Sequence, residues 1–231
     1  MFFSLCMATL VIGAEPAETP KSSKEALQPF NGLIAAWKGT GYPDGTREER
    51  AKGFWVEKID WAWGFQGDDA WLKMTIAEGK QFQSGELRYL PKTADYELKL
   101  TKTDKSEQSF IGKWNTGKQK EQILVLERGT ETETQQLTFT LLHSNRYLYQ
   151  LATKPKNAKT FTRLWQVGAT KEGEPFADAN KGPECIVTGG RGTMSVSFQG
   201  TTYYVCCSGC KDEFNAEPEK YIRLAAEKKK K

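Results

Sequence analysis

Apolar and polar residues alternate along most of the chain between residues 27 and 167. The alternation is clearest in residues 55–65, 96–100 and 137–141, where nearly every second residue is apolar. Successive side chains of a β-strand point to opposite faces, so this period predicts strands with one buried face. A chain with this pattern is expected to fold mainly as antiparallel β-sheet.

Turn-forming sequences rich in Gly, Asp, Asn and Pro separate the alternating runs. Their spacing is typical of antiparallel hairpins and predicts about ten short strands between residues 27 and 167. Because no helical pattern lies between them, the strands favour an up-and-down β-barrel, in which closure leaves no exposed sheet edge. A β-sandwich is the alternative. The separating turns are residues 43–45, 67–69, 78–80, 103–105 and 144–145.

Tryptophan is concentrated in the first half of this segment. Aromatic side chains on the inner face of a barrel either fill it as a packed core or line a pocket for a small, flat, apolar ligand. The single histidine ends the run 137–143 with the parity of its apolar neighbours, although a lone histidine at a strand end is more often structural. The residues that would contact such a ligand are Trp37, Trp55, Trp61, Trp63 and His143.

Residues 1–14 are largely apolar, whereas residues 15–26 are polar and contain proline. The contrast predicts a signal peptide cleaved near Ala14 and then a disordered spacer, although no Lys or Arg precedes the apolar run. No later run reaches the ~20 apolar residues that a membrane-spanning helix needs. We therefore expect an exported protein, periplasmic or extracellular, without stable membrane insertion after cleavage.

The periodic pattern stops after residue 167. Residues 168–182 predict an inter-domain linker, and residues 183–224 predict a small module with a hairpin and two helices. Residues 225–231 form a basic tail, whose run of lysines accounts for the formal net charge of +4. Because no other basic run or patterned basic face is present in the sequence, no nucleic-acid partner is expected.

The predicted C-terminal module contains Cys185 and, after a gap of twenty residues, Cys206, Cys207 and Cys210. A thiolate is a soft, strong metal ligand, and one distant cysteine with a closely spaced pair can bring a turn and a helix start to one ion. The spacing predicts a zinc or copper site formed by Cys185 and a closely spaced pair from the later group. A structural disulfide from Cys185 and a redox pair formed by Cys207 and Cys210 are the alternatives.

Three thiolates leave the expected site one ligand short of a closed zinc site, which has four. Cys206 and Cys207 are adjacent, and adjacent residues at a strand end point in opposite directions, so they are not expected to bind the same ion. The fourth ligand is then Cys207 after all, a carboxylate from Asp212 or Glu213, or water. Alternatively the ion is Cu(I), which accepts three thiolates.

The order of residues in this region follows a pattern: a cysteine in the turn 185–189, Gly-x-x-Tyr-Tyr-x-Cys at 200–206, then Cys210, Phe214 and an acidic-Pro-Glu-Lys-Tyr stretch at 217–221. The pattern resembles the YHS/TRASH-like family of small cysteine modules. This resemblance implies a treble-clef-like α+β fold implicated in heavy-metal binding or sensing. It also implies that Cys185, Cys206 and Cys210 are metal ligands, with Cys207 as a further candidate.

The first strand of the predicted barrel has a Trp-x-Gly-x-Gly pattern at Trp37, Gly39 and Gly41. This pattern and the strand count resemble calycin-like barrels, which include the lipocalins and the nitrobindin-like haem barrels. The resemblance implies an antiparallel barrel that carries a small apolar ligand. The chain departs from it at Ala35, where lipocalins have glycine, and it offers only His143 as a proximal haem ligand.

These observations favour an exported binding protein that captures a soft or borderline transition metal in its cysteine module. The first alternative is a carrier of a small apolar ligand in the barrel, with a purely structural cysteine module. The second is a thiol-redox protein. Apart from the cysteines, the sequence contains no paired nucleophile and base, no glycine-rich phosphate loop and no histidine-based hydrolytic motif, so we do not expect an enzyme.

Overall fold

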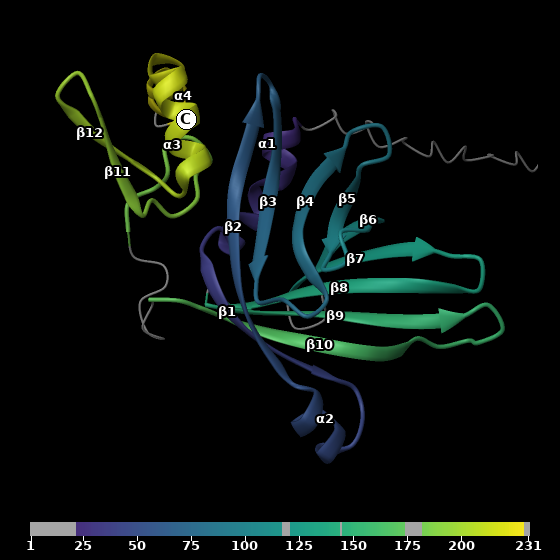
Figure 1. Ribbon diagram of the computed structural model, residues 1–231. Coiled ribbons are helices and arrows are strands. Elements are labelled where there is room, and N and C mark those ends of the chain that lie inside the picture. Colours follow the sequence, from purple (N-terminus) through teal and green to yellow (C-terminus); the bar gives the residue numbers. More distant parts are fainter. Residues whose placement is uncertain (1–21, 117–120, 144, 174–181, 229–231) are drawn as a thin grey trace, which may run out of the picture.

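The computed structural model describes residues 22–116, 121–143, 145–173 and 182–228. The predicted signal peptide lies outside these ranges. Ten strands and a short helix form the larger part of the molecule (Figure 1). They are β1 (Ala36–Pro43), α2 (Arg47–Gly53), β2 (Trp55–Gln66), β3 (Asp69–Ala77), β4 (Phe82–Leu90), β5 (Asp95–Lys102), β6 (Glu107–Thr116), β7 (Gln122–Gly129), β8 (Glu133–His143), β9 (Arg146–Pro155) and β10 (Thr162–Lys171).

The ten strands form one closed antiparallel barrel, in which strands that follow one another in the chain are neighbours. β1 closes the barrel by pairing with β10, from Trp37 opposite Lys171 to Pro43 opposite Trp165. The predicted up-and-down barrel, the architecture implied by the calycin-like resemblance, is confirmed, and the sandwich alternative is wrong. Closure gives both terminal strands a hydrogen-bonding partner, so neither is left as an exposed edge.

Aromatic rings fill the barrel interior. Phe139 stacks on Tyr149 with ring centroids 5.4 Å apart, and Trp61 meets the ring of Phe139 edge-on at 6.2 Å. Trp37 meets Tyr147 edge-on at 4.8 Å. Offset-stacked and edge-on arrangements are the favourable geometries for aromatic pairs, so the interior is a packed core.

One carboxyl lies among these rings. Glu57 is 1 % exposed and accepts hydrogen bonds from the indole nitrogen of Trp55, at 2.7 Å, and from the hydroxyl of Tyr149. Burial raises the pKa of Glu57, although both hydrogen bonds act in the opposite direction. The barrel therefore accommodates a buried acid by supplying two donors to it.

The structured part begins earlier than the sequence predicts. α1 (Ser23–Leu27) and the 3₁₀-helix η1 (Gln28–Leu33) precede the barrel, and the Ser22 side chain caps α1 by accepting a backbone hydrogen bond. Leu27 and Phe30 are completely buried. The predicted disordered spacer is therefore wrong for its last residues, because a helix cap and two buried apolar side chains stabilise the segment.

The C-terminal module consists of a hairpin and two helices, as predicted. Gly200, in the hairpin turn, has φ +75°, a conformation that glycine adopts without strain. Two predicted boundaries move: β10 continues to Lys171, inside the predicted linker, and α4 continues to Lys228, inside the predicted tail. The elements are β11 (Met194–Phe198), β12 (Thr201–Val205), α3 (Ser208–Ala216) and α4 (Pro218–Lys228).

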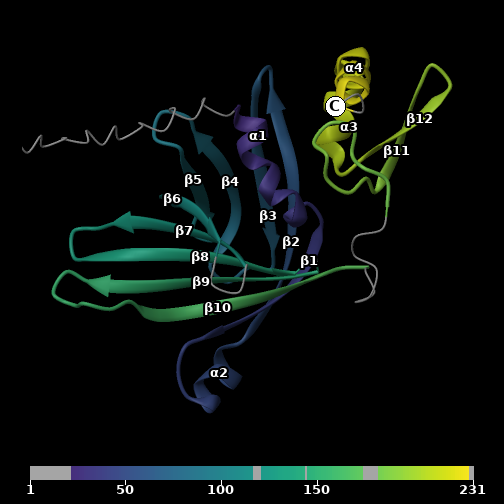
Figure 2. The same ribbon diagram turned by 180° about the vertical axis from the view of Figure 1, so that it is seen from behind.

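The module packs against the barrel along β2, as the two opposite views show (Figures 1 and 2). β1 starts at Ala36, opposite Asp60, so it does not cover the rest of β2. α3 lies beside this uncovered part, and buried residues of the barrel and the module form one continuous hydrophobic core. Within the described ranges, no helix combines the length and apolar character required for a membrane crossing.

Candidate metal centre

Cys185 meets the more C-terminal Cys206 and Cys210 near the start of α3. Cys185 lies in the turn before β11, Cys206 directly follows β12, and Cys210 lies in the first turn of α3. Their Sγ atoms all lie within 4.8 Å of one another, and those of Cys206 and Cys210 are 3.4 Å apart. Exposure of the three residues is 1 %, 7 % and 0 %. The structure therefore brings the three predicted metal ligands together in a buried cluster.

The turn that presents Cys185 is closed by two backbone hydrogen bonds. The amide of Gly189 donates to the carbonyl of Cys185 at 2.9 Å, and the amide of Cys185 donates to the carbonyl of Gly190 at 2.6 Å. Gly189 has φ +76°, in the left-handed region that favours glycine. The Cys-Ile-Val-Thr-Gly sequence therefore forms a tight turn that points its cysteine at the start of α3.

Thr188 is a member of the site that the sequence analysis missed. The residue is 1 % exposed, and its hydroxyl oxygen lies 3.5 Å from the sulfur of Cys206 and 3.9 Å from that of Cys210. A hydroxyl in this place can donate to a thiolate and lower its charge density. The sequence signal was the threonine inside the cysteine turn, which a search for soft ligands passes over.

The four sulfurs of the module do not hold their protons equally. Hydrogen bonds from Cys206 and Cys210 lower the pKa of Cys185, and the same two thiols lower the pKa of Cys207. The hydrogen bond with Cys185 raises the pKa of Cys206, and burial raises the pKa of Cys210. The thiols are therefore coupled to one another through hydrogen bonds. A bound metal ion would remove thiol protons, because coordination deprotonates a thiol.

The spacing of the sulfurs fits a shared metal ion. Sulfur ligands about 2.3 Å from a tetrahedral zinc ion lie about 3.8 Å from one another. The separation of 3.4 Å between Cys206 and Cys210, and the limit of 4.8 Å for all three sulfurs, are compatible with this value. A disulfide needs sulfur atoms about 2.05 Å apart. All four cysteines of the module are free, so the structure shows a thiol cluster rather than the alternative disulfide.

Cys207 has a separate role in the arrangement. It is the N-cap residue of α3, and its sulfur accepts a hydrogen bond from the backbone amide of Trp63 at 3.3 Å. The expectation that Cys206 and Cys207 point apart is wrong, since their sulfurs are 4.0 Å apart. The chain has already left β12 at these residues, so strand alternation does not apply to them. Cys207 lies outside the cluster of three but next to it.

The two carboxylates considered as a fourth ligand do not join the cluster. Asp212 is exposed on α3. The Glu213 carboxylate accepts a hydrogen bond from the hydroxyl of Tyr221, on α4. The nearest additional donors to the three sulfurs are therefore Cys207 and the hydroxyl of Thr188.

Asn31 joins the barrel to the cysteine module, and sequence reasoning gave no indication of it. Its side-chain nitrogen donates to the carbonyl of Thr188 at 3.0 Å, and its side-chain oxygen accepts from the indole of Trp63 at 3.1 Å. Gly209 adds a close approach, because a Cβ atom there would lie 1.8 Å from the carbonyl oxygen of Trp63. The cysteine module is therefore held directly against β2.

The tryptophans predicted to contact an apolar ligand are all buried, but they contact other protein groups. The indole nitrogen of Trp37 donates to the carbonyl of Leu33, and that of Trp55 donates to Glu57. The indole nitrogen of Trp61 donates to Tyr147, and that of Trp63 donates to Asn31. His143 ends β8, and its side chain lies outside the described part of the structure.

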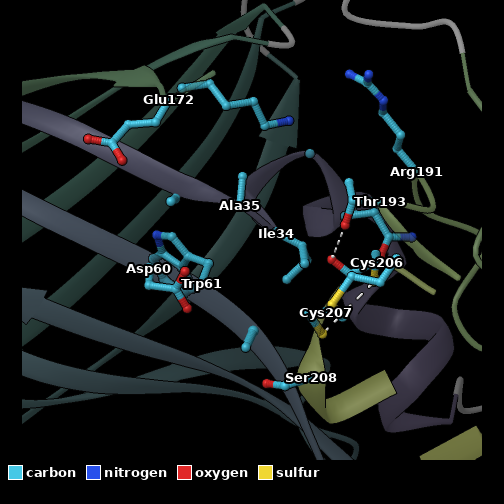
Figure 3. A pocket seen from close by; sticks show the side chains of 16 residues that line it. Ile34, Ala35, Asp60, Trp61, Glu172, Arg191, Thr193, Cys206, Cys207 and Ser208 are labelled. Atoms are coloured by element: carbon cyan, nitrogen blue, oxygen red, sulfur yellow. Dashed lines mark hydrogen bonds between the residues drawn. The ribbon is translucent and has the colours of Figure 1, made fainter. Parts of the chain in front are cut away.

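A cavity of about 540 Å³ lies between the barrel and the module (Figure 3). Cys206, Cys207 and Ser208 line it on the module side, and Asp60 and Trp61 line it on the barrel side. The hydroxyl of Thr193 donates to the backbone carbonyl of Cys206 at 3.1 Å and fixes the cysteine wall. Of the three clustered sulfur ligands, Cys206 is the one that borders this space.

Residues 190–225 match the model of the YHS domain family. The match confirms the predicted resemblance; it includes Cys206, Cys207 and Cys210 and begins just after Cys185. No curated protein matches the chain. Among solved structures, the chain is similar to the S-type phycobiliprotein lyase CPES from Guillardia theta, with 9 % identity and a TM-score of 0.41 over 68 % of this chain and 100 % of that one. This likeness is too slight to carry an argument.

Proposed function

We propose that this chain is an exported, non-enzymatic metal-binding protein that holds a soft or borderline transition metal, zinc or copper, in its C-terminal module. Cys185, Cys206 and Cys210 would be the ligands. The observation that carries the proposal is the meeting of their three buried sulfurs within 4.8 Å. The match of this region to the YHS domain family supports it. The barrel would hold the metal module in a fixed position.

The ligand set suits two kinds of ion. A zinc ion would complete its four ligands with Cys207, Thr188 or a water molecule. A Cu(I) ion would need no further ligand, because it accepts three thiolates. Soft sulfur ligands favour this ion. The cluster is buried, and the hydroxyl of Thr188 lies beside two of its sulfurs. Both features suit either ion.

Elemental analysis of the purified protein tests this proposal. The full chain would be purified under reducing conditions without chelator, and its metal content measured by inductively coupled plasma mass spectrometry. The matched variant replaces Cys185, Cys206 and Cys210 by serine together. We expect close to one zinc or copper ion per chain in the parent and none in the variant.

A second measurement separates the alternatives. Free thiols would be counted in protein purified without reductant. Absence of metal after reconstitution, together with fewer than four free thiols, would contradict the proposal and support a disulfide-linked structural module. Reversible oxidation of Cys207 and Cys210 with retained structure would instead favour the thiol-redox alternative.

Export rests on the apolar run at residues 1–14 followed by a polar stretch. Expression of the full-length chain in a Gram-negative host, with fractionation and N-terminal sequencing, tests it. A mature N-terminus near residue 15 in the periplasm is the expected result. An uncleaved chain in the cytoplasm would contradict it.

A further inference from the structure

The three clustered cysteines are buried, so a metal ion needs a way to reach them. The cavity between barrel and module provides one, because Cys206 forms part of its wall (Figure 3). Cys207 lines the same wall and is more exposed than Cys206. Two adjacent cysteines therefore line the cavity, and one of them, Cys206, belongs to the cluster.

The size and lining of this cavity fit a small molecule better than a bare ion. Its volume of about 540 Å³ is within the ordinary range for small-molecule sites. Charges of both signs line it, from Asp60, Glu172, Lys171 and Arg191. Ile34 and Trp61 add apolar surface. A ligand with carboxylate and ammonium groups on a short apolar frame matches this lining.

We propose that the cavity binds a soft metal ion as its complex with a small thiol that carries carboxylate and ammonium groups, and that Cys207 takes the ion from this carrier and passes it to Cys206. The inference rests on the proposed metal-binding function. Soft ions are held strongly by thiolates, so a small thiol is a suitable carrier for them. Cys207 is thereby a transfer ligand rather than a member of the final site.

The transfer is a ligand exchange with no change of oxidation state. The sulfur of Cys207 forms a bond to the metal as one bond between the metal and the carrier sulfur breaks, and the Cys207 proton passes to the released carrier thiol. A second exchange forms the bond from the metal to Cys206 and breaks the bond to Cys207, which recovers a proton from Cys206.

The geometry around Cys207 suits this role. Its sulfur lies 4.0 Å from that of Cys206, close to the separation of about 3.8 Å between two sulfurs bound to one zinc ion, so an ion can bridge both during transfer. The amide of Trp63, on β2, donates to the Cys207 sulfur at 3.3 Å and stabilises its negative charge. Transfer and docking against the barrel therefore use the same residue.

Loading kinetics test the transfer step. Metal-free full-length protein would be mixed in a stopped-flow instrument with the Cu(I)–glutathione complex as the probe. In Cys207→Ser we expect loading slower by about tenfold or more, because the thiolate is the exchanging group. The final copper content should be unchanged.

The charged lining of the cavity is tested by the Lys171→Ala/Arg191→Ala variant. We expect its loading from the anionic glutathione complex to be slower by about tenfold, and its loading from the acetonitrile complex of Cu(I) to be unchanged.

A metal-free measurement tests the cavity separately. S-methylglutathione, which cannot bind through a thiolate, should bind the parent chain in isothermal titration calorimetry. Ala36→Trp places a large side chain at the cavity wall and should abolish this binding. Ala77→Trp, at an exposed position away from the cavity, should keep it.

These outcomes separate the two proposals. No binding of S-methylglutathione, or equal loading rates in the parent, Cys207→Ser and Ala36→Trp, would overturn the transfer inference while leaving the metal site in place. Absence of copper from the parent at equilibrium would overturn the proposed function and the transfer step with it, even where S-methylglutathione still binds.

Discussion

The barrel and the cysteine module are stabilised in different ways. The barrel closes on itself through ten paired strands and fills its interior with aromatic rings such as Trp37, Trp61 and Phe139. The module has a two-stranded hairpin and two helices, and its buried residues include the three clustered cysteines and Phe214. A unit of this size buries too little apolar surface to be stable by that means alone.

The comparison shows where each region gains its stability. The barrel closes through its own strands and packs its interior with its own side chains and those of α1 and η1. The module has two additional supports: a metal ion on its cysteines, which we propose, and the contact of α3 with β2, which the structure shows.

Metal removal should have the largest effect and should be confined to the module. Binding of structural zinc contributes about 10–16 kcal/mol in small zinc-dependent domains. After chelation, we expect amide hydrogen exchange to become faster in residues 183–228, although docking of α3 on β2 still holds the module in place, and to remain slow in the barrel strands. Hydrogen-exchange mass spectrometry measures both regions in one experiment.

The triple serine variant of Cys185, Cys206 and Cys210 is the control, since chelator should change nothing in it. Retained protection of the module after complete metal removal would contradict this prediction. Docking on β2 would then be the main support of the module.

Truncation in the barrel core should have the next largest effect, in the opposite region. Phe139 is 2 % exposed and contacts the rings of Trp61, Tyr147 and Tyr149. Phe139→Ala should lower the free energy of unfolding by about 3–5 kcal/mol, because it leaves a cavity among these rings. Urea denaturation followed by circular dichroism measures the loss.

Metal content should not change in Phe139→Ala, because the cysteine cluster does not touch this ring. Leu142→Ala, at a position of the same strand that is 43 % exposed, is the matched control and should lie within about 0.5 kcal/mol of the parent. A similar loss in both variants would show that the strand, and not the ring packing, determines barrel stability.

Docking of the module on the barrel should be sensitive to Gly209. An added Cβ would lie 1.8 Å from the carbonyl oxygen of Trp63, so Gly209→Ala forces α3 away from β2. We expect a loss of about 1–3 kcal/mol, typical of overpacking, and faster hydrogen exchange in α3. Gly129→Ala, which has no neighbour within 4 Å, is the control. An unchanged α3 in Gly209→Ala would show that the contact relaxes without cost.

The sequence was informative about each region and uninformative about their junction. Alternation along β2 predicted which side chains face inward, and the cysteine spacing predicted the cluster of Cys185, Cys206 and Cys210. The contact through Asn31 and Gly209 could not be predicted, because it depends on β2 extending beyond the start of β1. No local pattern encodes where one strand ends opposite another.

Helix α1 was missed for a related reason. Its five residues carry too little periodicity to be read as a helix, and their stability comes from Leu27 and the neighbouring Phe30, buried in the barrel core. Tertiary packing of this kind stabilises short helices that are marginal in isolation.

The buried acid of the barrel gives the smallest prediction, a change with pH. Burial raises the pKa of Glu57 in the folded state above its ordinary value of 4.5. The folded state therefore binds this proton more tightly than the unfolded chain, and the resulting stabilisation is complete below pH 4.5 and is lost as pH rises through the raised value. Glu57→Gln removes this loss, so its stability relative to the parent should increase from pH 4 to pH 8.

Urea denaturation of both proteins across this pH range measures the difference. Glu131→Gln, an exposed change on a turn of the barrel, is the control and should follow the parent at each pH. A constant difference between Glu57→Gln and the parent would show that the hydrogen bonds from Trp55 and Tyr149 fully offset the burial of the charge. Because Glu57 belongs to the barrel, the pH dependence should persist after chelation, whereas a pH effect that disappears with the metal would belong to the cysteine cluster.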